Sequence, residues 1–392
     1  MYEKFINPDI AAIPPSGIRR FFDIAATMKD AISLGVGEPD FVTPYHIRNA
    51  AINSILDGET QYTGNRGMPE LLEEISYYLE NRYQTRYDPS TEIMVTVGAS
   101  EAIDVALRAL VSPGDEVLVP EPSYVSYSPS VIFATGKPVG VVTTDATEFR
   151  LTPEAVRAAI TPRTKFLILP YPNNPTGGIM EKEDLQKIAE VVKEHDLLVI
   201  SDEIYSELTY GGRQHVSFAS LPGMWERTIT LNGFSKAFAM TGWRVGYACG
   251  PKELISVMLK IHQYAIMCAP RMGQVAALEA LRNGRMNGYE DVVRMRESYD
   301  RRRRLMVEGF RAMGLDCFEP LGAFYVFPSI KPTGLTSEEF CNRLIQEHKV
   351  ACVPGTAFGA CGEGHIRCSY ATGIDKLNIA LEQMEKFVKS LK

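Results

Sequence analysis

Short apolar runs that alternate with helix-period segments restrict the fold of this chain more than any other feature of its sequence. The runs lie at 93–97, 115–119, 138–142, 165–169, 197–201, 228–232 and 245–249. Segments between them, such as 153–160 and 182–194, repeat apolar residues at helical spacing. Strands that alternate with helices form a mostly parallel sheet with helices on both faces. The sequence therefore predicts an α/β fold built around such a sheet.

A second domain is expected because the pattern changes after about residue 283. A long amphipathic helix over 288–313 is followed by short strands and by helices over 336–348 and 374–391. A chain of 392 residues is also longer than one hydrophobic core usually supports. We expect the C-terminal part to form a smaller α+β domain.

The charge of the chain excludes some classes of partner. A formal net charge of −7 makes nucleic acid and anionic membranes unexpected partners. The run Arg301–Arg304 lies in the expected long helix beside acidic residues, so we interpret it as a solvated helix face or a subunit contact. The N-terminus has no basic region followed by a long apolar segment, so we expect no signal peptide. No apolar stretch is long enough to span a bilayer. We expect a protein that does not associate with membranes.

The cysteines indicate a reducing environment. There are seven, they are scattered, and no C-x-x-C motif occurs. This pattern predicts neither a disulfide framework nor a structural zinc site, and no metal site is expected. We therefore expect the protein in the cytoplasm.

Polar residues follow three of the predicted strands. Gly98-Ala99-Ser100 opens a helix and could bind an anion through N–H groups and a hydroxyl. Asn174 lies in the turn Pro172–Gly177, and its amide could donate to a phenolate oxygen. Asp202 and Tyr205 follow the strand 197–201 and could bind a protonated pyridine nitrogen and a ring hydroxyl. Each motif alone is also a common turn or helix cap.

Lys236 indicates that these motifs could belong to one binding site. It lies between two apolar runs, directly after Ser235 and eight positions before Arg244. A lysine amine can bind the aldehyde of pyridoxal phosphate as a Schiff base, while the serine and the arginine hold the phosphate. A surface lysine in a turn bounded by glycine is the alternative interpretation of the motif alone.

The motifs together resemble those of the class I/II aminotransferases, the pyridoxal-phosphate enzymes of the aspartate aminotransferase superfamily. The resemblance covers nearly the whole chain and is most specific at Asn232–Arg244 and Asn174–Gly177. It implies a mostly parallel, seven-stranded sheet between helices in a large domain at 48–283. It also implies an N-terminal arm at 1–15 and a small domain formed by 16–47 and 284–392.

The resemblance assigns roles to the cofactor-binding residues. Lys236 holds pyridoxal phosphate and moves a proton during catalysis, with Asp202 on the pyridine nitrogen and Tyr205 as the third catalytic residue. Tyr205 and Asn174 bind the ring oxygen, and Tyr124 stacks on the ring. The phosphate would be bound by Ala99, Ser100, Ser235 and Arg244.

The resemblance also implies a homodimer and a substrate clamp. Tyr62 reaches the phosphate of a neighbouring subunit, so the active sites lie at the subunit interface. Arg367 binds the substrate α-carboxylate, for which its planar fork is suited, with help from Asn174 and from the backbone of Gly37.

The expected reaction moves an amino group from an L-amino acid to a 2-oxo acid such as 2-oxoglutarate. Aspartate, aromatic and N-acetyl-diaminopimelate-like donors stay open, and Arg20, Arg66 and Arg271 are candidates to bind a substrate side chain. Lyase or other carbanion chemistry on the same scaffold is the alternative. A DNA-binding regulator is not expected, because the fifteen residues before Ser16 are too few for a winged helix.

Overall fold

The computed structural model describes residues 2–15, 17–18, 28 and 30–391. Its centre is a seven-stranded sheet in the order β2-β8-β7-β6-β5-β3-β4. The strands are β2 (Ile93–Thr96), β3 (Glu116–Glu121), β4 (Lys137–Val142), β5 (Thr164–Leu169), β6 (Leu198–Asp202), β7 (Thr228–Gly233) and β8 (Gly246–Cys249). All seven apolar runs are therefore strands, and the predicted α/β fold is confirmed.

One strand of this sheet runs against the others. β8 is antiparallel to both β2 and β7, whereas β3, β4, β5, β6 and β7 pair in parallel. An antiparallel pair needs no crossover helix, so β7 returns into β8 through a short connection. Because the other strands are parallel, the segments that follow β2, β3, β5, β6 and β7 all emerge at one edge of the sheet.

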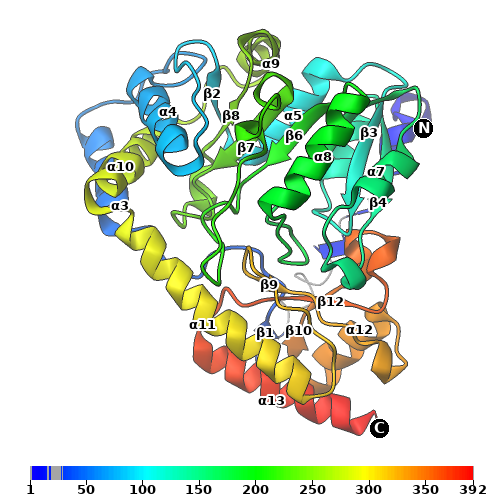
Figure 1. The fold of residues 1–392 in the computed structure, drawn as a ribbon. Coiled ribbons are helices and arrows are strands. Elements are labelled where there is room, and N and C mark those ends of the chain that lie inside the picture. Colours follow the sequence, from blue (N-terminus) through cyan, green and yellow to red (C-terminus); the bar gives the residue numbers. More distant parts are fainter. Residues whose placement is uncertain (1, 16, 19–27, 29, 392) are drawn as a thin grey trace.

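Helices cover both faces of the sheet (Figure 1). One face packs against α5, α6 and α9 through side chains such as Met94 and Ile200. The other face packs against α7 and α8 at one end and against α3, α4 and α10 at the other. These helices are α3 (Tyr45–Leu56), α4 (Pro69–Tyr83), α5 (Gly98–Leu110), α6 (Tyr127–Phe133), α7 (Pro153–Ala159), α8 (Lys182–Glu194), α9 (Lys252–Ala265) and α10 (Arg271–Asn287).

The C-terminal part forms a second, smaller α+β unit. Its helices are α11 (Glu290–Ala312), α12 (Ser337–His348) and α13 (Ile374–Ser390), and its strands are β9 (Tyr325–Val326), β10 (Val350–Ala351), β11 (Val353–Pro354) and β12 (Ile366–Ser369). β12 pairs antiparallel with both β9 and β11. The long helix α11 links the large sheet to this unit (Figure 1).

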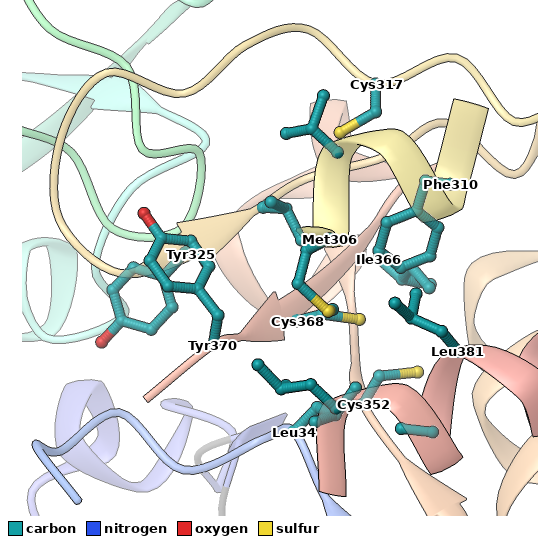
Figure 2. Packing of buried hydrophobic residues seen from close by; sticks show 14 of the residues in the cluster. Leu34, Met306, Phe310, Cys317, Tyr325, Cys352, Ile366, Cys368, Tyr370 and Leu381 are labelled. Atoms are coloured by element: carbon teal, nitrogen blue, oxygen red, sulfur yellow. The ribbon is translucent and has the colours of Figure 1, made fainter. Parts of the chain in front are cut away.

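The N-terminal segment contributes to the smaller unit. β1 (Ile32–Ser33) pairs in parallel with β10, and Leu34 is fully buried among residues of α11, β12 and α13. Figure 2 shows Leu34 packed near Cys352 and Leu381 in this core. The exact domain boundaries at 16–47, 48–283 and 284–392 stay a prediction, which this pairing supports.

The arginine run of α11 differs from the expectation of a solvated face. Arg302 and Arg303 are buried, and only the outer two arginines of the run are exposed. Arg302 Nη1 pairs with Asp40 at 2.8 Å, and Arg303 Nη1 pairs with Glu319 at 2.7 Å. The expectation was wrong for these two because, besides the local partner Asp300 of Arg303, they pair with carboxylates from outside the helix.

The shorter elements lie near the N-terminus and in the segments between the longer helices and strands. They are α1 (Pro8–Ala11) and the 3₁₀ turns η1 (Glu3–Phe5), η2 (Asp145–Thr147), η3 (Phe218–Ser220), η4 (Trp225–Arg227), η5 (Thr241–Trp243), η6 (Lys331–Thr333), η7 (Gly355–Phe358) and η8 (Ala360–Gly362). Across the part of the chain that the structure describes, no helix has both the length and the apolar character needed to cross a membrane.

Candidate active site

Lys236 lies on the connection between β7 and β8, at the edge of the sheet where the parallel strands end. Its side chain reaches toward the smaller unit, where Nζ donates to the carbonyl of Gly37 at 2.7 Å. The ammonium also lies 5.8 Å from the ring centre of Tyr205 and 5.7 Å from that of Phe324. The lysine is therefore held between the two units of the chain.

The surroundings of Lys236 favour its neutral amine. Burial is the main reason that the pKa of Lys236 is lowered to about 8; the positive charges of Arg367 and Arg244 also lower it, whereas Glu38 and Asp202 raise it. An amine with this pKa is about one tenth neutral at pH 7, far more than an ordinary lysine. Four charged groups from separate segments thus surround one reactive nitrogen.

Asp202, the last residue of β6, is buried and held by two donors. The Tyr127 hydroxyl donates to Oδ2 at 2.8 Å, and the Ile204 backbone N–H donates to Oδ1 at 3.2 Å. Burial raises the pKa of Asp202 above its ordinary value, while these two hydrogen bonds favour the carboxylate. The arrangement fixes the orientation of the carboxyl group inside the sheet edge.

Tyr205 is also buried, three residues beyond the end of β6. Its hydroxyl lies 2.8 Å from the hydroxyl of Tyr325 on β9. Burial, reinforced by Tyr325, raises the pKa of Tyr205 well above its ordinary value, so both phenols are neutral at physiological pH. A neutral phenol can donate a hydrogen bond to a ligand oxygen.

Arg367 on β12 is almost fully buried and faces several oxygen acceptors. Nη1 donates to Asn174 Oδ1 at 2.9 Å, Nη2 donates to the carbonyl of Gly35, and Nε has no hydrogen-bond partner. The guanidinium lies 4.6 Å from the ring centre of Tyr325 and 4.9 Å from that of Phe358. A cation buried between aromatic faces, with Nε unpartnered, suits a carboxylate ligand.

An anion cradle forms where α5 begins beside Arg244. The first N–H groups of a helix lack partners within that helix, and here Gly98, Ala99 and Ser100 supply them. Gly98 has φ +74°, and a Cβ on it would lie 2.6 Å from Arg244 Nη2. A Cβ on Gly246 would lie 2.5 Å from the Ala99 nitrogen. Gly98 therefore lets the start of α5 approach Arg244, and Gly246 lets it approach β8.

Two more of the predicted cofactor residues lie near these groups. Ser235 is buried and directly precedes Lys236 on the same connection. Tyr124 follows β3, and its ring packs edge-to-face on Tyr127 with centroids 5.7 Å apart. Tyr127 in turn holds Asp202, so the expected stacking ring lies beside the expected pyridine partner.

Tyr62 stands apart from this group. Its side chain is 76% exposed in the single chain. The neighbouring Asn65 ties this loop to the loop after α9 by donating to the Met267 carbonyl at 2.9 Å. Tyr62 therefore lies on the surface, as a residue that acts on another subunit would.

The arginines considered for substrate side chains have other contacts. Arg66 Nη1 donates to the carbonyls of Thr91 and Ile93, each at 3.1 Å. Arg271 pairs with Glu59 at 3.3 Å. Arg20 lies outside the described residues.

The sequence did not reveal three residues that the fold brings to this site. Tyr127 holds Asp202, Tyr325 contacts Tyr205, and Gly35 accepts from Arg367. Only Tyr127 carried a signal, since it lies three residues after Tyr124. The pairing of β9 with β12, which places Tyr325, is not visible in the sequence.

The donor set matches the chemistry of pyridoxal phosphate. A lysine with a lowered pKa can bind an aldehyde, a buried carboxylate can hold a protonated ring nitrogen, and the cradle at Gly98 can take a phosphate. Arg367 adds a cation for the carboxylate of an amino acid. The residues therefore fit this cofactor and this class of substrate.

Comparison with known proteins places these features in one family. The family model described as aminotransferase class I and II matches residues 29–384. The putative aminotransferase YugH of Bacillus subtilis (strain 168) is 54% identical over 98% of both chains. An aspartate aminotransferase of Pyrococcus abyssi is 50% identical over 97% of both chains. The crystal structure of an aromatic aminotransferase from Pyrococcus horikoshii OT3 superposes with a TM-score of 0.90 at 47% identity, covering 94% of this chain and 99% of that one. The chain belongs to the class I and II aminotransferase family.

Proposed function

We propose that this aminotransferase uses pyridoxal phosphate, bound through Lys236, to move the amino group of an L-amino acid to a 2-oxo acid such as 2-oxoglutarate. The observation that carries the proposal is the convergence on Lys236 of Asp202, Arg244 and Arg367 from three separate segments. Lyase chemistry is not favoured, since the relatives that the chain matches are aminotransferases.

Lys236 acts as the proton carrier of the reaction. When bound, pyridoxal phosphate supplies an aldehyde for amino groups and a ring that takes up the electrons released at the substrate Cα. The Lys236 amine, with a pKa of about 8, takes the proton from Cα and later returns one. The Gly37 carbonyl, 2.7 Å from Nζ, orients the amine.

Asp202 and Tyr205 tune the ring through its two polar atoms. The Asp202 carboxylate keeps the proton on the pyridine nitrogen, and Tyr127 and Ile204 hold that carboxylate in place. Tyr205 donates to the ring oxygen, as does the amide of Asn174. Tyr124 supports one face of the ring.

The remaining assigned residues bind the two acidic groups. Ala99, Ser100, Ser235 and Arg244 bind the phosphate at the start of α5. Arg367 binds the substrate α-carboxylate, and its unpartnered Nε supports that role. Asn174 and the backbone of Gly37 complete the carboxylate site.

The surroundings of Arg367 favour an aromatic amino acid as the amino-group donor over aspartate or an N-acetyl-diaminopimelate-like donor. Phe358 lies on the guanidinium and packs with Ile18 and Phe327 in an apolar cluster. Arg66 and Arg271, which could bind a second carboxylate, contact other groups. An apolar surface beside Arg367 suits a substrate with an aromatic side chain better than one with a charged side chain.

A homodimer completes the site in this proposal. Tyr62 is exposed, as are Tyr264 (88%) near the end of α9 and Ile266 (47%) on the following loop, which Asn65 joins to the segment that contains Tyr62. Such a surface favours contact with a second copy of the chain. Tyr62 would then reach the phosphate of the partner subunit.

The cytoplasm is the proposed location, because the seven free cysteines suit a reducing compartment. The substrates are small molecules, and neither nucleic acid nor a membrane is part of the proposal.

A donor panel tests the proposed reaction. The loaded protein is mixed with single amino acids, without any 2-oxo acid, and the absorbance of the bound cofactor is followed. We expect tyrosine or phenylalanine to convert it fastest, and 2-oxoglutarate to reverse the change. Lys236→Ala should abolish both changes. Steady release of ammonia without a 2-oxo acid would contradict the assignment.

A further inference from the structure

Tyr325 lies where the two units of the chain meet, although nothing in the proposed reaction assigns it a role. It is the first residue of β9 and is 1% exposed. Its ring belongs to the core of the smaller unit, and Figure 2 shows its hydroxyl pointing away from Met306 and Cys368. A fully buried hydroxyl at the edge of a core needs a polar partner.

That partner is Tyr205 of the larger unit. The two hydroxyl oxygens lie 2.8 Å apart, and the rings meet edge-to-face with centroids 5.9 Å apart. Two other contacts fix the Tyr325 ring. The Arg367 guanidinium lies over one face at 4.6 Å, and a Cβ on Gly37 would lie only 2.6 Å from Oη. Tyr325 thus touches the residues assigned to the ring oxygen and to the substrate carboxylate.

The direction of this hydrogen bond follows from proton counting. Each phenol has one proton, and a tyrosine that donates its proton to one acceptor can only accept at its other contacts. Tyr205 donates to the ring oxygen in the proposed function, on which this inference rests. In the hydrogen bond between the two hydroxyls, Tyr325 must then be the donor and Tyr205 the acceptor.

We propose that Tyr325 is a positioning residue that donates its hydroxyl proton to the Tyr205 oxygen and so makes Tyr205 a stronger donor to the ring oxygen of the bound cofactor. Hydrogen bonds in a chain polarise one another, and the strengthening is about 10–30% per bond. Arg367 keeps Tyr325 in place through its ring face. Tyr325 therefore links Arg367, which binds the substrate carboxylate, to the ring of the cofactor.

The test is a pH titration of the absorbance of the bound cofactor. Loss of the Tyr205 hydroxyl in Tyr205→Phe should raise the midpoint by about one to two pH units, since a hydrogen bond to a charged oxygen is lost. Tyr325→Phe keeps the ring under Arg367 and should raise the midpoint by about 0.1–0.6 units, which is 10–30% of the Tyr205→Phe shift. The double variant should titrate like Tyr205→Phe alone, because Tyr325 acts only through Tyr205.

One further variant separates this role from general packing. Tyr370→Phe removes a buried hydroxyl from the same core, one that donates to the Ala323 carbonyl at 3.2 Å, and should leave the midpoint unchanged.

The outcomes distinguish this inference from the proposed function. If the wild type shows no absorbance from bound pyridoxal phosphate, the proposed function fails. If Tyr205→Phe shifts the midpoint but Tyr325→Phe titrates like the wild type, only the role of Tyr325 is overturned. Additive shifts in the double variant would also overturn it, because they would mean that Tyr325 acts independently of Tyr205.

Discussion

The Tyr127 hydroxyl should determine how readily Asp202 carries its charge. In Tyr127→Phe, the buried carboxylate loses the donor at 2.8 Å and keeps only the Ile204 N–H at 3.2 Å. A hydrogen bond to a charged group contributes about 1.5–3 kcal/mol, and one pKa unit corresponds to about 1.4 kcal/mol. The pKa of Asp202, which burial already raises, should therefore rise by about one to two further units.

This shift predicts a destabilisation that depends on pH. A carboxyl group whose pKa is higher in the folded than in the unfolded state binds more protons when folded, so its contribution to stability falls as the pH rises. Both proteins carry a protonated Asp202 at low pH. The variant should lose about 1.5–3 kcal/mol relative to the wild type only at a pH above the raised pKa of Asp202 in the folded variant.

Urea unfolding of the cofactor-free protein at several pH values measures this difference. Tyr171→Phe is a matched control, because it removes a buried hydroxyl that donates to the neutral Phe149 carbonyl at 2.8 Å. The control should lose about 0.5–1.5 kcal/mol at every pH. A pH-independent loss in Tyr127→Phe, equal to that of the control, would refute the reasoning.

Four other predictions concern the assigned groups. The rate at which the cofactor-free protein takes up pyridoxal phosphate, measured by stopped-flow absorbance, should rise with pH along a curve whose midpoint is at about pH 8, because the neutral Lys236 amine is the nucleophile. Gly98→Ala should lower cofactor affinity about tenfold in equilibrium titration, since its Cβ would displace Arg244 and alanine disfavours φ +74° at a cost of about 1–2 kcal/mol. Arg367→Lys should raise KM for the amino acid about 100-fold with little change in cofactor affinity, because a lysine cannot bind a carboxylate with two parallel bonds. Tyr62→Phe should weaken cofactor binding while light scattering still reports a dimer; unchanged cofactor affinity would remove Tyr62 from the phosphate site.

The sequence predicted the architecture well because the signals are local. The run 165–169 became β5 (Thr164–Leu169), and the segment 182–194 became α8 (Lys182–Glu194). Strands buried on both faces are continuous apolar runs, so their positions can be recognised without knowledge of their partners. The order of polar residues at strand ends then indicated which side chains would meet.

The sequence could not predict contacts made by segments far apart in the chain. Tyr325 reaches Tyr205 because β9 pairs with β12, and no periodicity specifies that pairing. The run that contains Arg302 and Arg303 resembled a solvated face, since its partners Asp40 and Glu319 lie outside the local pattern. Such contacts depend on tertiary packing, which overrides the local charge pattern.

The identity of the lysine that binds the cofactor tests the central claim most directly. Borohydride reduction of the loaded protein makes the link between cofactor and lysine permanent, and peptide mass spectrometry locates it. We predict one pyridoxyl group per chain, on the peptide that contains Lys236. Modification of a different lysine, or of none, would contradict the account.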